Sequence, residues 1–266
     1  MAYTTINKST DYFNTKLYTG NSGTQTISGI GHQPDLIWGK NRASNRHFLA
    51  DSVRGKKTTG YYLLCTNNTE GDTSNSASDG ITSINSDGFV LGANASNTDG
   101  GWSYELNGNA RNFVAWNWKA GGAGSANTDG DINSTVSVNQ TAGFSIVKYT
   151  GTDVAGATVG HGLNAVPKMI ILKRLVGSGY DWVVYHTDKT AGLYLNSTGT
   201  NNDSSSNNIW FNGTAPTSSV FSIGTDGRIG DATNFIAYCF AEKTGYSKIG
   251  SYTGNGNANG PMVYTG

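Results

Sequence analysis

The sequence predicts an all-β protein with two tandem antiparallel β-sandwich domains, jelly-roll-like in type, and a C-terminal β-hairpin extension. Apolar and polar residues alternate in short runs of about five residues, and turn residues recur roughly every 8–12 positions. Thirty-seven glycines against four prolines is typical of short strands joined by tight turns. The same order of signals occurs twice, in residues 12–122 and 143–245, which indicates an internal repeat.

The two copies are organised around one related segment, which occupies residues 112–118 in the first copy and 234–240 in the second. Read with a period of two, both segments carry large apolar side chains on both faces. Such a strand belongs in the middle of a sheet that is covered on both sides. We therefore expect these side chains in the structural core: Phe113, Trp116, Trp118, Phe235, Tyr238 and Phe240.

The first module, residues 12–122, has the following expected strands: 13–20, 25–30, 35–40, 47–51, 61–65, 81–84, 89–91 and 112–118. An Asp-Gly pair at 87–88 lies between two of these runs and favours a tight hairpin. The stretch around Trp102 is polar and rich in glycine, and it is expected to be a loop.

The segments outside the two modules have different expected roles. Residues 1–11 are polar and predict an N-terminal arm that becomes ordered against a partner. Residues 123–142 have the Gly/Ser/Asn-rich composition of a flexible linker, with room for one short strand at 135–138. Residues 143–245 form the second module, and 246–266 repeat the opening motif as the start of a third copy, which we expect to be a docking hairpin.

Charge excludes several classes of partner. Only 14% of residues are charged, 18 basic and 18 acidic, so neither a nucleic-acid partner nor a polybasic membrane anchor is expected. Membrane insertion is not expected either, because the aliphatic runs are far shorter than a membrane span. The N-terminus lacks the features of a signal peptide, and synthesis in a reducing cytoplasm is expected. Cys65 and Cys239 are expected as buried free thiols, although a bridge between them is an alternative.

Motifs for catalysis are absent from the sequence: it has no nucleophile elbow, no zinc-type Cys or His spacing and no complete P-loop. The histidines, His32, His47, His161 and His186, are interpreted as turn residues bonded to the backbone, with a metal or acid–base site as the alternative. We therefore expect no catalytic residues, no cofactor and no metal.

Aromatic residues in polar loops are the candidate contact residues. Trp102 and Tyr104 follow two glycines, and Trp210 follows a run of Asn and Ser. Such rings stack on sugars while neighbouring polar groups bond the hydroxyls, or they cap the ends of the sandwiches or bury in a subunit interface. The second explanation is favoured.

Several motifs together resemble a repeated module of virion structural proteins from tailed bacteriophages, notably marine ones, many of them tail-fibre-like. The motifs are Tyr18-Thr19-Gly20, Gly31-x-x-Pro34-Asp35-Leu36-Ile37-Trp38, Asp51-Ser52-Val53-Arg54-Gly55, Ser86-Asp87-Gly88-Phe89 and residues 112–122. The second copy departs from this pattern at 184–188 and has Cys239 in place of Asn117.

The resemblance implies a non-enzymatic virion structural protein, either a tail fibre or appendage or a capsid decoration. Such a protein is made in the host cytoplasm, works on the virion surface, contacts other virion proteins and forms a homo-oligomer, with a trimer favoured. The alternative is a lectin-like carbohydrate-binding module that recognises a host surface glycan. A glycan hydrolase is the third hypothesis, but no pair of carboxylates could be nominated for it.

Overall fold

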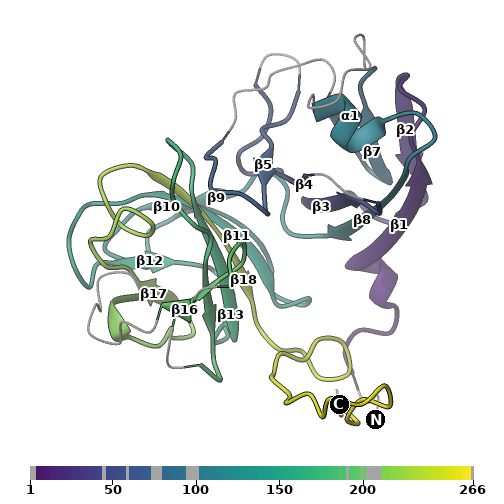
Figure 1. Ribbon diagram of the computed structural model, residues 1–266. Helices are drawn as coiled ribbons and strands as arrows, with labels where there is room; N and C mark the ends of the chain where they lie inside the picture. Colours follow the sequence, from purple (N-terminus) through teal and green to yellow (C-terminus); the bar gives the residue numbers. More distant parts are fainter. Residues whose placement is uncertain are drawn as a thin grey trace.

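A computed structural model of the chain is shown in Figure 1. The structure describes residues 4–43, 46–57, 60–72, 80–93, 102–189, 192–198, 200–201 and 211–264. The all-β prediction is confirmed, since helix is limited to three short segments of the described residues: η1 (Ser9–Asp11), α1 (Trp102–Asn107) and η2 (Phe211–Gly213). No helix in these ranges is long and apolar enough to span a bilayer.

The N-terminal half of the chain, residues 12–122, forms two antiparallel sheets. The larger sheet has the strand order β1 (Phe13–Thr19), β8 (Asn112–Trp118), β3 (Leu36–Asn41), β4 (His47–Asp51) and β5 (Leu64–Cys65). The smaller sheet has the order β2 (Gln25–Ser28), β7 (Gly88–Leu91) and β6 (Ile81–Asn85). Buried side chains from both sheets meet in one core, which includes Phe48, Phe89 and Phe113.

The C-terminal half, residues 123–247, also has a large and a small antiparallel sheet. The large sheet has the order β16 (Thr200–Asn201), β15 (Gly192–Tyr194), β14 (Val183–His186), β13 (Met169–Arg174), β18 (Asn234–Phe240), β11 (Phe144–Thr150), β10 (Ser134–Asn139) and β9 (Ser125–Asn127). The small sheet pairs β12 (Thr158–Gly160) with β17 (Val220–Ser222). A second core lies between the two sheets and includes Phe211, Phe221 and Phe235.

The two halves share one strand order, because β1-β8-β3-β4-β5 corresponds to β11-β18-β13-β14-β15 and β2-β7 to β12-β17. The match extends to side chains. Tyr18 stacks on Phe113 with ring centroids 5.1 Å apart, and Tyr149 stacks on Phe235 at 5.3 Å. The hydroxyl of each tyrosine donates a hydrogen bond to a backbone carbonyl, at 2.8 and 2.7 Å respectively. These pairs hold the first strand of each half onto its central strand.

The two central strands differ in burial. In β18, both Phe235 and Tyr238 are buried, although they point to opposite faces of the sheet, and Phe240 is half-buried at the strand's end. In β8, Phe113 faces the core and is buried, whereas Trp116 and Trp118, expected in the core, are only half-buried. The reason is that they point to the outer face of the sheet, which the C-terminal half covers only in part.

The segment 123–142, expected as a flexible linker, is instead part of the C-terminal half. Its strand β10 pairs along its whole length with β11, and β9 pairs with β10. The alternating sequence of 134–139 places Val136 in the second core, and this burial together with the ladder of hydrogen bonds orders the segment.

The terminal segments also differ from expectation. The expected hairpin within 246–266 does not form in the described part of the tail: residues 248–264 contain no strand. An isolated pair of strands buries too little apolar surface to be stable alone. In the N-terminal arm, η1 forms and Ile6 is buried, so residues 4–11 are ordered against the chain itself. Residues 4–11 and the tail 248–264 lie on the same side of the view in Figure 1.

Candidate functional site

The two halves pack against each other through the outer faces of their large sheets. An apolar cluster at this junction combines Leu36, Leu49 and Leu64 of the N-terminal half with Trp182 and Tyr238 of the C-terminal half. All five side chains are buried. Outer faces of sheets are normally polar in a sandwich, so the apolar residues on them are explained by this second layer of packing.

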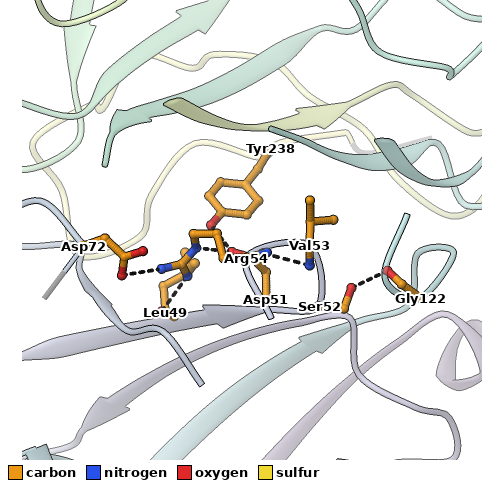
Figure 2. A network of polar contacts seen from close by, with 8 residues as sticks. All are labelled: Leu49, Asp51, Ser52, Val53, Arg54, Asp72, Gly122 and Tyr238. Atoms are coloured by element: carbon orange, nitrogen blue, oxygen red, sulfur yellow. Dashed lines mark hydrogen bonds and ion pairs between the residues drawn. The ribbon is translucent and has the colours of Figure 1, made fainter. Parts of the chain in front are cut away.

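A buried polar network reinforces the junction, and Figure 2 shows it from close by. The guanidinium of Arg54, in the turn after β4, donates to Asp51 at 2.5 Å, to Asp72 at 3.2 Å and to the carbonyl of Leu49 at 3.2 Å. From the other half, the hydroxyl of Tyr238 donates to the same Asp51 carboxylate at 2.8 Å. The network therefore joins β4 of one half to β18 of the other.

The buried position of this network shifts the pKa values of its charged side chains. Only 1% of the Arg54 side chain and none of the Asp51 side chain is exposed. Burial is the largest single influence on Arg54 and would lower its pKa, but the nearby Asp51, Tyr238 and Asp72 together outweigh it, so the pKa is raised. Burial raises the pKa of Asp72 to about 6, although Arg54 acts in the opposite direction. Arg54 therefore remains charged and is held in a pocket closed to solvent, which suits it to a structural role.

A second set of bonds crosses the junction beside the loop that follows β5. The amine of Lys173 donates to the carbonyl of Thr69 in the other half at 3.1 Å and to that of Tyr180 at 2.5 Å. The indole N–H of Trp182 donates to the carbonyl of Cys65 at 3.0 Å. Burial lowers the pKa of Lys173 to about 8. These bonds satisfy groups that would otherwise be costly to bury, and they fix the two halves as one body.

An aromatic cleft opens next to the junction, between the outer faces of β8 and β18. Its volume is about 500 Å³. Four of its lining rings are in contact: Trp118 has its centroid 4.8 Å from that of Phe13 and about 6 Å from those of Phe144 and Phe240, which are 5.0 Å from each other. Tyr246, just before the tail, lies at its border. The cleft can hold an apolar group or the flat face of a ring, and no Asp, Glu, His, Lys or Arg is among the described residues that line it.

Of the candidate contact residues from the sequence, Tyr104 is not among the residues that line this cleft. Trp102 is the first residue of α1, and Trp210 lies outside the described residues. Tyr104, also on α1, is half-buried beneath the guanidinium of Arg111, which lies 4.2 Å from the ring centroid. The sequence held one signal for the cleft: both central strands place aromatic residues on their outer faces, where solvent would favour polar ones.

The buried histidines bond to the backbone. The Nδ1 atom of His32 lies 3.0 Å from the carbonyl oxygen of Thr10, and the Nε2 atom of His161 lies 3.2 Å from that of Thr217. Burial lowers the pKa of both rings. Within the described ranges, no three residues of the His, Cys, Asp or Glu types are grouped so that they could hold a metal ion. Cys65 and Cys239 are free and buried.

The equivalent strands β1 and β11 differ in how their outer edges are covered. In the C-terminal half, β10 pairs with β11 over its full length. In the N-terminal half, β1 is the last strand of its sheet, and no strand of the described residues pairs with its outer edge. Leu17, on this strand, is 61% exposed. A free edge with an exposed apolar side chain is a template for a further strand.

The comparisons with known proteins give one match. The sequence matches a family described as a domain of unknown function (DUF7483), over residues 8–266. No curated protein and no solved structure matches.

Proposed function

The chain belongs to the DUF7483 family, and we propose that it is a non-enzymatic structural subunit of a bacteriophage virion, a tail fibre or appendage or a capsid decoration. In this proposal the two halves are tandem jelly-roll sandwiches held rigidly together, and the subunit works on the virion surface in contact with other virion proteins. The resemblance of the sequence motifs supports the class of protein, and the buried junction supports a rigid building block.

The observation that carries the assembly role is the free outer edge of β1. Its counterpart β11 pairs with β10 in the C-terminal half, and this supports the addition of an antiparallel strand at the equivalent edge of β1. We expect the occupant to be the C-terminal segment of a second copy. In that segment Tyr252, Met262 and Tyr264 are 70%, 93% and 79% exposed, and strand addition would pair its backbone.

The sequence of the tail supports this choice. Ser251-Tyr252-Thr253-Gly254 repeats the motif that ends β1 and β11, and 261–264 repeat the segment that enters β3 and β13. The tail thus carries strand-forming sequence that finds no strand partner within the described part of its own chain. Exchange of tails around a ring of subunits gives a closed homo-oligomer, with a trimer favoured.

Size-exclusion chromatography with light scattering tests this proposal. The full chain is expected to have a multiple of its mass of 28.0 kDa. A variant that ends after Lys248 and the variant Leu17→Lys should both be monomeric, with unchanged far-UV circular dichroism. The control Val166→Lys places a charge at another exposed apolar residue and should leave the oligomer intact. A full chain that is monomeric at tens of micromolar, or an oligomer that survives both changes, would overturn the proposal.

A carbohydrate-binding role is a second candidate, and the aromatic cleft favours it. Half-buried rings such as Trp118 can stack on the face of a sugar. A glycan array should then show binding that is lost in Trp118→Ala, whereas Trp102→Ala and Trp210→Ala test the loop residues from the sequence. An array without any bound glycan would remove this role and leave the assembly role untouched.

A further inference from the structure

A small polar hollow lies at one end of the N-terminal sandwich, away from the junction of the halves. It has a volume of about 400 Å³ and lies where β3 ends and β8 begins. The residues that line it are Asn41, Arg42, Ala43, Ala110, Arg111 and Asn112. Two of these side chains are guanidinium groups and none is a carboxylate, so the hollow is positively charged.

The hollow contains a buried donor without an acceptor. The side chain of Asn41 is fully buried, and its Oδ1 accepts the backbone N–H of Ala43 at 3.0 Å. Its Nδ2 has no hydrogen-bond partner among the described residues. A buried N–H group that bonds to nothing is costly, and such a group commonly marks the place of a ligand.

The two arginines differ in how they are held. The guanidinium of Arg111 lies over the ring of Tyr104 and donates to its hydroxyl. This stacking fixes the group in place and leaves other N–H donors free. Arg42 takes part in none of the ion pairs of the described residues. The hollow therefore combines one oriented guanidinium, a second that is unpaired and a buried amide donor.

The internal repeat shows what the corresponding place in the C-terminal half contains. Residues 108–113 read Gly-Asn-Ala-Arg-Asn-Phe, and residues 230–235 read Gly-Asp-Ala-Thr-Asn-Phe. In the C-terminal copy, Arg174 forms an ion pair with Asp231 and lies over the ring of Tyr180 at 4.1 Å. That copy thus provides its own carboxylate for a stacked guanidinium. The N-terminal copy has Asn109 at the position of Asp231.

We propose that this hollow binds one oxyanion group, a carboxylate, sulfate or phosphate, through Arg42, Arg111 and Asn41. In the other half the Asp231 carboxylate neutralises Arg174, which stands at the position of Asn41 in the strand pairing, whereas the bound group would neutralise Arg42 and Arg111. Guanidinium groups bond such anions with two parallel N–H donors, and the Nδ2 group of Asn41 adds a further N–H donor. The same chemistry is offered by a free inorganic anion and by an acidic sugar. The proposal is independent of the assembly role.

Isothermal titration calorimetry on the full chain at low ionic strength tests the site, with sulfate, phosphate and glucuronate as probes and glucose as the neutral control. Saturable binding of sulfate or phosphate identifies a site for the free anion. Saturable binding of glucuronate alone identifies the carboxylate of a sugar. Arg42→Gln and Arg111→Gln should each weaken binding at least about tenfold, because each removes a charged hydrogen-bond donor.

Two further variants separate this site from general charge effects. Arg228→Gln removes a partly exposed guanidinium from the other half and should leave the affinity unchanged. Asn109→Asp restores the carboxylate of the C-terminal copy and should weaken anion binding, with the melting temperature unchanged or raised. Equal losses in Arg228→Gln and Arg111→Gln, or affinity that none of the variants changes, would mean an adventitious ion only and overturn the proposal. Absence of any saturable binding would do the same.

Discussion

Replacement of Arg54 by methionine tests the importance of the buried network between the two halves. The change removes the positive charge but keeps an apolar chain of similar reach. It leaves the Asp51 carboxylate, with a fully buried side chain, bonded only to neutral donors. Breaking a buried pair in this way costs about 3–5 kcal/mol. Since domains are stable by only about 5–15 kcal/mol, this is a large fraction of the total.

Urea unfolding followed by tryptophan fluorescence measures this loss. If the free energy of unfolding falls by about 3 kcal/mol per M of urea, the urea concentration at the midpoint of unfolding should fall by roughly 1–2 M. The control Lys248→Met removes an exposed partner of Glu242 and should cost less than about 1 kcal/mol. The double variant Arg54→Met with Asp51→Asn should recover part of the loss, because it leaves no unpaired charge at position 51. A loss in Arg54→Met no larger than in Lys248→Met would refute the reasoning.

Three further predictions concern stability. Burial raises the pKa of Asp72 to about 6 from its model-peptide value of 3.8, so the folded chain binds more protons than the unfolded chain between these values. The stability that Asp72 contributes is thus present below pH 4 and is lost as the pH rises through 6. Urea unfolding between pH 4 and 7 should show a free energy of unfolding that falls with pH, and the fall should be smaller in Asp72→Asn. Gly39→Ala would place its Cβ 1.9 Å from the buried ring of Phe48 and should lower stability by about 1–3 kcal/mol. The control Gly254→Ala has open space around it, so thermal unfolding should show a lower melting temperature for Gly39→Ala alone. Tyr238→Phe leaves the buried carboxylate of Asp51 with one hydrogen bond fewer, and urea unfolding should show a loss of stability of about 1–3 kcal/mol. No measurable loss would mean that this hydrogen bond does not stabilise the fold.

The buried junction has a consequence for how the protein would work in an assembly. Domains joined by a flexible linker reorient independently, whereas here backbone bonds from Gly71 to Gly177 and from Asp72 to Leu175 tie a loop of one half to the other. Together with the apolar cluster, these bonds make the pair of sandwiches a single mechanical unit. A subunit that transmits position or force within a larger particle benefits from such stiffness, in keeping with the proposed structural role.

The elements that depend on local signals follow from the sequence alone. Alternation with period two and turns such as Asp87-Gly88 are properties of a few neighbouring residues, so the all-β class and the repeated order of strands could be predicted. The same alternation predicts that a strand has two apolar faces, but it does not predict which part of the chain covers each face. It therefore placed Trp116 and Trp118 in a core, although they lie half-buried beside the junction.

Which segments meet across long stretches of chain depends on how the whole molecule packs. Residues 134–139 lie in a segment that the sequence predicts as a linker with room for one short strand, and the edge of β11 gives that strand a partner along its whole length. Arg54 belongs to the sequence motif Asp51-Ser52-Val53-Arg54-Gly55, but the motif does not predict that Tyr238, far along the chain, encloses it with its carboxylate partners. The physical reason is that burial and ion pairing depend on which surfaces pack together, and that information is shared between residues distant in the sequence rather than held in any one motif.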